Sequence, residues 1–296
     1  MRSAWSRREA AWSAAFEVRA LGRGDTRAAL DFLAREPVRD LFIASRIVSD
    51  GVLGPVGWSP LWGAFDRNER LRGVLHLGPN LVPAVEELEV CDHFASLAAG
   101  PGPTRMLVGE RRSTERLWRL VAGSYPTPRE VRERQFVYAL TPEALAPRPR
   151  LGPAGRARPA RRGDEERVLR LSAAMYLEEM GEDPLARDPG GYRRRVRVLT
   201  DRGWTYVYEH GGELVFKMDV GCASDHGAQI QGVYVPPELR GRGVGTRAMA
   251  ACCALAFERH PTLSLYVNDF NRPAVALYER LGFRRLPFDF QTVMLP

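Results

Sequence analysis

Lysine is nearly absent from this chain of 296 residues: of its 43 basic side chains, only Lys217 is a lysine. The others are arginines, and the formal net charge is +7. A positive balance of this kind suits an anionic ligand. The chain has neither the paired Cys and His spacing of a zinc module nor the aromatic strand motif of an RNA-binding domain, so nucleic acid is not expected as a partner.

Cysteine and histidine are also scarce. The four cysteines include the neighbours Cys252 and Cys253, and no Cys-x-x-Cys occurs. Adjacent residues on a helix cannot both face one ion, and the five histidines lie at no metal-ligand spacing. We therefore expect the cysteines to be small core residues in a reducing compartment, and we expect no metal.

Long apolar runs are missing, so no segment is expected to span a bilayer. The basic stretch Met1–Arg8 is not followed by the continuous apolar segment of a secretory signal. A hydrophobic content of 45% and a charged content of 27% are typical of a globular chain, here long enough for two domains. We expect a cytoplasmic protein with no membrane partner.

The most informative stretch runs from Gln229 to Thr246. Ile230–Val235 is β-branched and aromatic and predicts a strand, which ends at two prolines that cannot donate ladder hydrogen bonds. A glycine-rich turn, Arg240–Gly245, follows, and a helix is expected to begin at Thr246. Unpaired amides at the positive end of a helix favour the binding of a diphosphate.

Two phosphate-binding families are excluded by this turn. The dinucleotide fingerprint requires a glycine where Ala248 stands, and a P-loop requires Gly-Lys-Ser/Thr where the chain has Gly245-Thr246-Arg247. The remaining pattern, Arg240-x-x-Gly243-x-Gly245, resembles the acyl-CoA loop of the GNAT (GCN5-related) N-acetyltransferases.

A second block carries the same resemblance. Downstream of the strand Leu263–Asn268 stand Asn271, Ala274, Leu277-Tyr278-Glu279 and Gly282-Phe283, in the register of a GNAT motif. Two matching blocks in the right order identify the second half as GNAT-like. The resemblance implies an α/β (α+β) fold with a mixed, mostly antiparallel sheet flanked by helices.

The resemblance also implies a site for acyl-CoA, the expected co-substrate. Main-chain groups of the strand would hold the pantetheine arm, the turn and helix start would hold the diphosphate, and a downstream Asn would complete the site. In this sequence those residues are Val233, Tyr234, Val235, Arg240, Gly241, Arg242, Gly243, Val244, Gly245, Thr246 and Asn271. Tyr278 stands where the family places the general acid that protonates the departing thiolate.

The amine acceptor must lose a proton, which requires a carboxylate or a water polarised by one. Glu178 and Glu179 on a predicted helix, Asp219 on a predicted strand and Glu238 beside the loop are the candidates. Asp219 and Glu178 rank first, because those elements usually line the acceptor groove of GNAT proteins.

Two halves are expected. After a frayed start (1–15), residues 16–140 form one domain, a Pro- and Arg-rich linker covers 141–160, and 161–296 form the catalytic domain. Arg23-Gly24-Asp25 and Arg162-Gly163-Asp164 precede predicted helices and suggest tandem GNAT-like halves. The first half lacks the acyl-CoA loop: Gly100-Pro101-Gly102-Pro103 is expected in its place, and prolines lack amide donors. Together with the C-terminal half, four further segments extend a resemblance to actinobacterial GNAT proteins with an N-terminal domain of unknown function over nearly the whole chain: Leu61-Trp62-Gly63, Gly78–Pro83, Val215-Phe216-Lys217 and Ser264–Asn268.

Hydrophobic periodicity and turn residues predict most of the regular elements. Expected strands are 16–21, 61–65, 71–77, 80–84, 135–140, 205–209, 213–220 and 228–235, and expected helices are 41–48, 114–121, 165–180 and 192–200.

The resemblance implies an acyl-CoA-dependent N-acyltransferase that acts directly on a primary amine, with acetyl-CoA as the co-substrate. Two alternatives stay open: a tandem acetyltransferase of the mycothiol-synthase type, and a non-catalytic acyl-CoA sensor or regulatory module. The oligomeric state is also open, a homodimer included.

Overall fold

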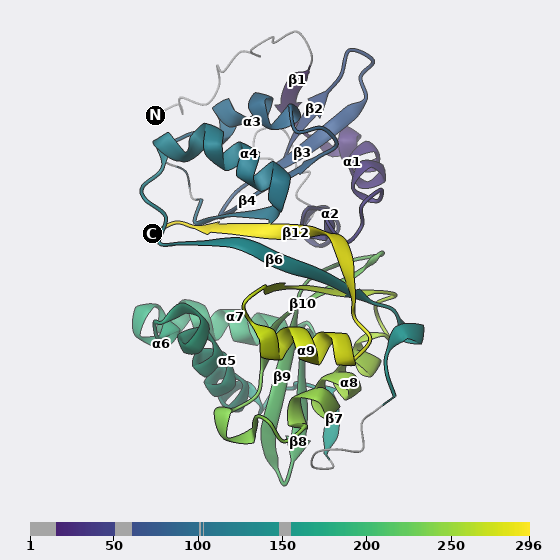
Figure 1. The fold of residues 1–296 in the computed structure, drawn as a ribbon, viewed down its shortest axis with the longest axis vertical. Helices are drawn as coiled ribbons and strands as arrows, with labels where there is room; N and C mark the ends of the chain where they lie inside the picture. The colour runs from purple at the N-terminus through teal and green to yellow at the C-terminus, as the bar shows by residue number, and fades with distance from the viewer. Residues whose placement is uncertain (1–15, 51–60, 101, 103, 148–154) are drawn as a thin grey trace. The chain divides into compact units, whose positions relative to one another are not determined.

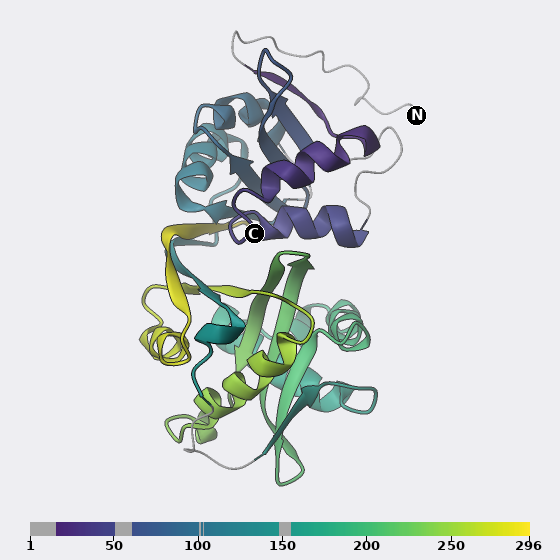
Figure 2. The same cartoon turned by 90° about the vertical axis from the view of Figure 1, so that its right-hand side faces the viewer.

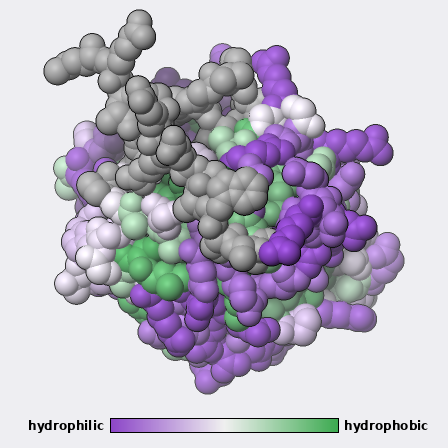
Figure 3. All heavy atoms as spheres, turned by 90° about the horizontal axis from the view of Figure 1, so that it is seen from above, coloured by the Kyte–Doolittle hydropathy of each residue, from purple (hydrophilic) through white to green (hydrophobic). Residues whose placement is uncertain are grey.

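The computed structural model describes residues 16–50, 61–100, 102, 104–147 and 155–296. The chain forms two compact units: one extends to Val137 and also includes Pro287–Pro296, and the other is Tyr138–Leu286. Figure 1 shows the elements of both units. No helix in the described ranges combines the length and hydrophobicity needed to cross a membrane. On the face drawn in Figure 3, hydrophilic side chains cover most of what is not grey.

The first unit is built on a mainly antiparallel sheet with the order β1-β2-β3-β4-β5-β12. Its strands are β1 (Glu17–Ala20), β2 (Leu61–Phe65), β3 (Leu71–Leu77), β4 (Asn80–Val85) and β5 (Met106–Glu110). Its helices are α1 (Thr26–Leu33), α2 (Leu41–Asp50), α3 (Val90–Ala98) and α4 (Arg111–Val121). The core lies between the sheet and α3 and α4, and includes the fully buried Leu75, Phe94 and Leu117.

The last strand of the chain returns to the first unit. In β12 (Arg284–Met294), residues Phe290–Met294 pair antiparallel with β5. Val293 and Leu295 are buried in the core of the first unit. The strand is drawn in yellow in Figures 1 and 2. The first unit is therefore completed by the C-terminal residues of the chain, which follow the second unit in the sequence.

The second unit has the strand order β11-β10-β9-β8-β7. Its strands are β7 (Arg156–Pro159), β8 (Thr205–His210), β9 (Glu213–Ser224), β10 (Gly227–Tyr234) and β11 (Leu263–Asn268), and β6 (Glu130–Leu140) enters this unit at Tyr138. Its helices are α5 (Glu165–Met180), α6 (Pro184–Arg187), α7 (Pro189–Asp201), α8 (Val244–Ala256) and α9 (Arg272–Arg280).

Short polar turns produce the hairpins. The turn of the β8–β9 hairpin has φ values of 57° at Gly211 and 83° at Gly212, the left-handed geometry that glycine adopts without steric cost. The predicted linker contains a short 3-10 helix, Pro142–Ala144, and the strand β7. Pro159 is accommodated because β7 is the edge strand of its sheet.

Both units begin with the same local structure, 139 positions apart in the sequence. In the first, Arg19 binds Asp25 through Nη1 and Nη2 at 2.9 and 2.8 Å. In the second, Arg158 binds Asp164 through Nη1 and Nη2 at 2.6 and 3.0 Å. Each aspartate also accepts from the amide three residues before it, Gly22 or Arg161. Asp25 occupies the N-cap position of α1, but its side chain binds Arg19 and the amide of Gly22 and makes no cap bond to the helix.

The backbone repeats as well. Leu21 N donates to Leu61 O at 2.9 Å, and Ala160 N donates to Thr205 O at 2.7 Å, at equivalent places. In each unit one parallel ladder joins two strands at only two residue pairs, between β4 and β5 and between β10 and β11. We conclude that the two units are tandem copies of one strand–helix arrangement.

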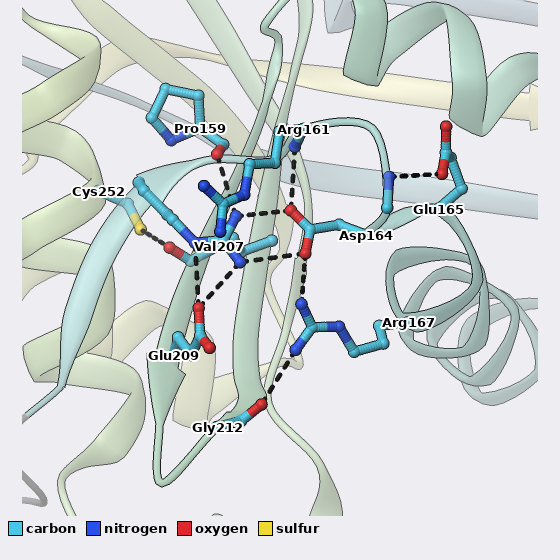
Figure 4. Close-up of polar contacts among 11 residues, drawn as sticks. Pro159, Arg161, Asp164, Glu165, Arg167, Val207, Glu209, Gly212 and Cys252 are labelled. Carbon is cyan, nitrogen blue, oxygen red and sulfur yellow. Dashed lines mark hydrogen bonds and ion pairs between the residues drawn. The ribbon is translucent and has the colours of Figure 1, made fainter.

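In the second unit this local structure is part of a larger ion-pair cluster (Figure 4). Arg158 binds both Asp164 and Glu209, and its Nη2 donates to Glu209 Oε2 at 2.9 Å. Arg167 donates to Asp164 Oδ1 at 2.5 Å and to Gly212 O at 3.0 Å. The cluster connects β7, β8 and the start of α5.

Candidate active site

The central feature of the second unit is the separation of two neighbouring strands. The parallel ladder between β10 and β11 contains the pairs Ala228↔Leu263 and Gln229↔Ser264. Both strands continue beyond these pairs, to Tyr234 and Asn268, yet no further ladder pair joins them within the described residues. Beyond Gln229 the main-chain groups of β10 on the β11 side therefore have no ladder partner in β11, and we call this separation of the two strands the notch.

The glycine-rich turn follows at the end of β10. A short 3-10 helix, Pro237–Leu239, leads into a turn in which φ is 72° at Gly241 and 75° at Gly243. The helix α8 begins at Val244, two residues earlier than predicted, because Gly243 takes the N-cap position in a left-handed conformation. The first backbone bond of the helix runs from Arg247 N to Gly243 O at 3.1 Å.

This geometry leaves amides at the helix start without acceptors inside the helix. They belong to Val244, Gly245 and Thr246, the first three helical positions. Gly245 lies close to the end of β10, since a Cβ there would lie 3.3 Å from Val235 Cγ2. The helix start therefore presents backbone donors, together with the positive end of its dipole, beside the end of β10.

Of the two arginines in the turn, Arg240 is already engaged. Its Nη1 and Nη2 each donate to a carboxylate oxygen of Glu178 at 2.7 Å, and its Nε donates to Val235 O at 2.9 Å. The hydrogen bond from Arg240 lowers the pKa of Glu178. Arg242 is exposed. The structure thus places Glu178 in an ion pair that links α5 to the turn.

Asp219 also lies in an ion pair, in the interior. Its Oδ2 accepts from Lys217 Nζ at 2.7 Å, and its Oδ1 accepts from Thr205 Oγ1 at 2.8 Å. Lys217 is completely buried and Asp219 is 6% exposed. Both carboxylate oxygens of Asp219 are therefore occupied by donors.

Tyr278 lies on α9 and is 7% exposed. Its ring packs against Tyr138 and Phe283, with centroids 6.4 and 5.7 Å away. No group in the described part of the chain hydrogen-bonds its hydroxyl. Burial raises its pKa well above the ordinary value, and the charge of Glu179 adds to the rise. The phenol is therefore neutral at physiological pH and retains its proton.

Glu179 occupies a different environment from its neighbour Glu178. Its charge raises the pKa of Tyr278 on α9 and also that of Tyr192 on α7. Tyr192 donates to Ser172 O at 2.8 Å and meets the ring of Tyr176 edge-on at 5.8 Å. Burial raises the pKa of Tyr192 to about 12. Sequence reasoning did not single out this tyrosine pair, since two aromatics on separate helices carry no local motif.

Asn271 is the N-cap of α9, where its Oδ1 accepts from Ala274 N at 3.3 Å. Pro273 follows at the start of the helix, as is common for a residue without an amide donor. Asn271 lies in the loop that follows β11, and its side chain is exposed to solvent.

No group of three or more potential metal ligands occurs in the described ranges. The cysteines are free and buried, in agreement with the core role predicted for them.

The first unit carries a different connection where the second has its glycine-rich turn. The segment between β4 and α3 is Glu86-Glu87-Leu88-Glu89. The predicted counterpart, Gly100–Pro103, instead follows α3; that prediction was wrong because α3 and β5 were not recognised in the sequence, and Pro101 and Pro103 lie outside the described residues. Arg72 binds both Glu86 and Glu87. Carboxylates thus stand where a diphosphate would require donors.

Two known families match different parts of the chain. Residues 176–283 match the acetyltransferase (GNAT) family, and residues 59–168 match a domain of unknown function, DUF4081. A mycothiol acetyltransferase of Nocardioides sp. is 34% identical over 177 residues, which cover 52% of this chain and 56% of that protein. A mycothiol acetyltransferase of Salinispora arenicola is 35% identical over 103 residues, 34% of this chain and 28% of that protein. The matches thus span about half or less of these curated relatives.

Solved structures resemble the whole chain. A GCN5-related N-acetyltransferase from Sphaerobacter thermophilus aligns with a TM-score of 0.57 at 16% identity, covering 95% of this chain and 96% of that one. A Drosophila protein aligns with a TM-score of 0.65 at 15% identity, covering 94% and 98%. At these identities the likeness concerns the fold, and it confirms the predicted fold class.

Proposed function

Because residues 176–283 form an acetyltransferase domain of the GNAT family, we propose that the protein transfers an acyl group, acetyl in the simplest case, from acyl-CoA to a primary amine. One observation carries the proposal: the notch beside β10 opens next to the unpaired amides at the start of α8. A CoA diphosphate at those amides places its pantetheine arm along the main chain of Val233, Tyr234 and Val235.

In this proposal the remaining loop residues supply charge and shape. Arg242 faces the diphosphate, while Arg240 holds the turn against α5 through Glu178. Gly241, Gly243 and Gly245 allow the backbone of the turn to approach the phosphates, and Asn271 contacts the cofactor from the opposite side. Tyr278 donates its proton to the CoA thiolate when the amide product forms.

For the proton of the amine we favour Glu179. The ion pair with Arg240 lowers the pKa of Glu178 and makes it a weaker base. Both carboxylate oxygens of Asp219 already accept, from Lys217 and from Thr205. Besides burial, the charge of Glu179 raises the pKa of the Tyr278 hydroxyl, which supports a role for both groups in the same reaction. On this assignment Glu179→Gln lowers kcat at neutral pH, whereas Glu178→Gln leaves kcat closer to that of the parent.

The function is tested by thiol release from acetyl-CoA in the presence of a panel of amines. The matched pair Gly245→Glu and Gly245→Ala provides the binding control. The carboxylate of Gly245→Glu repels the diphosphate but is compatible with a helix start, so we expect folding with acetyl-CoA affinity lowered at least tenfold, the effect of losing about 1.4 kcal/mol. Undiminished affinity in this variant contradicts the proposed site.

A second candidate acceptor follows from the relatives. Several curated relatives are mycothiol acetyltransferases, and the tandem units favour an enzyme of that kind with a small amino-sugar thiol as acceptor. Including such a compound in the amine panel distinguishes it from peptide and polyamine acceptors. A protein that binds acetyl-CoA and releases no thiol with any amine would instead be an acyl-CoA sensor.

A further inference from the structure

A buried ion pair lies directly against the strand that borders the notch. Lys217 and Asp219 stand two positions apart on β9, so both side chains point to the same face of the sheet. Val207, which pairs with Lys217 in the ladder, packs on that face with Val168 of α5 and Val196 of α7. The pair thus lies under α5 and α7, the helices that carry Glu179 and Tyr192.

The pair coincides with a bulge in the neighbouring strand. Gln231 pairs with Asp219 and Tyr234 pairs with Lys217, so β10 has two residues, Gly232 and Val233, where β9 has one. An inserted residue of this kind bends the strand and redirects its main-chain groups. Here the bulge includes Val233, the first of the main-chain groups proposed to face the acyl-CoA.

The charged atoms of Lys217 and Asp219 lie close to Gly232, a residue of the bulge. Gly232 has a φ of 61°, and a Cβ on it would lie 2.7 Å from Asp219 Oδ2 and 3.0 Å from Lys217 Nζ. The charged atoms therefore lie close to the backbone of Gly232, and a side chain at this position would require the ion pair or the strand to shift. Thr205 fixes the other oxygen of Asp219, so the pair is held from two sides.

Stability alone does not explain the pair. Removing two charges from water costs several kcal/mol per ion, and apolar residues of similar size are often as stabilising as a buried ion pair. Lys217 is also the single lysine of a chain with 43 basic residues. A compact ammonium fits beneath the bulge, whereas the guanidinium of arginine is larger and planar.

We infer that the Lys217–Asp219 pair is a positioning element that fixes the bulge at Gly232 and, through it, the main-chain groups of β10 that face the acyl thioester. The inference rests on the proposed function, since it assigns the bulge to the acyl end of the cofactor. It makes Asp219 a positioning residue.

The test compares Lys217→Met with the double variant Lys217→Met, Asp219→Leu. The single variant leaves a carboxylate buried without its cation, so we expect a lower melting temperature and lower turnover. The double variant removes both charges, so its melting temperature should recover. We expect its kcat to stay at least tenfold below that of the parent, while the dissociation constant of CoA is unchanged because the diphosphate site is intact. Recovery of kcat together with stability would reduce the pair to a structural role and overturn the inference.

Asp164→Asn is the matched control, because it weakens another buried ion pair of the same unit, between Asp164 and Arg158 of β7. In the order of the strands, β9 and β8 separate β7 from β10. Its melting temperature should fall while kcat is unchanged. A second readout needs no turnover: the ratio of acetyl-CoA affinity to CoA affinity should change in the double variant and not in Asp164→Asn. If the parent protein itself releases no thiol, the proposed function fails, and this ratio alone decides the inference; an unchanged ratio overturns it.

Discussion

The phenol of Tyr278 has the properties that a proton donor to a thiolate requires. Burial keeps it protonated, its ring is held by Tyr138 and Phe283, and its hydroxyl has no hydrogen-bond partner among the described residues. Tyr138, by contrast, donates its hydroxyl to Glu279 Oε1 at 2.8 Å. Of the two neighbouring phenols, Tyr278 is the one whose proton is not already donated within the protein.

Replacing Tyr278 with Phe should therefore lower kcat and leave cofactor binding intact. The ring and its packing remain, and general acid catalysis typically contributes about 10²-fold or more. Steady-state thiol release and a direct measurement of the dissociation constant of CoA separate the two effects. Tyr138→Phe serves as the control, and a kcat in Tyr278→Phe equal to that of the parent would exclude the acid role.

At the scale of single elements, the strand–helix junction at Asp164 links stability to pH. Burial alone would raise the pKa of Asp164, but the hydrogen bonds from Arg158 and the amide of Arg161 lower it to about 2. A carboxyl group with a depressed pKa stabilises the folded state in its ionised form. Its contribution is complete above about pH 4, the pKa of an unfolded aspartate, and is lost as the pH falls toward 2.

Asp164→Asn should accordingly lower the free energy of unfolding by about 2 kcal/mol at pH 7. The difference between variant and parent should shrink as the pH is lowered from 4 to 2, because the parent loses the same interaction by protonation. Denaturant titrations at several pH values measure this. A difference that stays constant down to pH 2 would show that the ionised carboxylate is not the source of the stability.

The burial of the C-terminal strand β12 in the first unit leads to a second prediction at the scale of single elements. Val293 is fully buried in the core of the first unit, and Val131 on β6 is 37% exposed. Val293→Ala should cost about 2 kcal/mol of unfolding free energy, and Val131→Ala much less. Hydrogen exchange should accelerate in β5 and α3 rather than in β8–β10. Faster exchange confined to the second unit would contradict the assignment of this strand.

Some elements could be predicted from the sequence and others could not, for physical reasons. The β8–β9 hairpin and the strands Leu61–Phe65 and Leu71–Leu77 lie where alternation and turn residues place them. The helix α3 and strand β5 were missed although the turn residues Gly100–Pro103 lie between them, because that segment was interpreted as the counterpart of the acyl-CoA loop. The engagement of Glu178 by Arg240, 62 positions away, has no local signature at all.

At the scale of the whole molecule, the repeated architecture has diverged at the one segment that decides ligand binding. The two units share the Arg–Asp junction and the short parallel ladder. After that ladder, however, the second unit continues into a glycine-rich turn with Arg240 and Arg242, and the first continues into three glutamates within Glu86–Glu89. The GNAT match lies within the second unit, whereas the match to the domain of unknown function begins in the first unit and continues to residue 168 of the second.

This divergence predicts that the chain binds one acyl-CoA, not two. Asp92 lies in the first turn of α3 and is paired with Arg116. The positive end of that helix dipole therefore already has a carboxylate beside it. Glu86 and Glu87 add like charge against a diphosphate. Isothermal titration with acetyl-CoA should give a stoichiometry of one per chain for the parent and none for Gly245→Glu. A residual equivalent of binding in Gly245→Glu would locate a second site and show that the glutamates of the first unit do not exclude the cofactor.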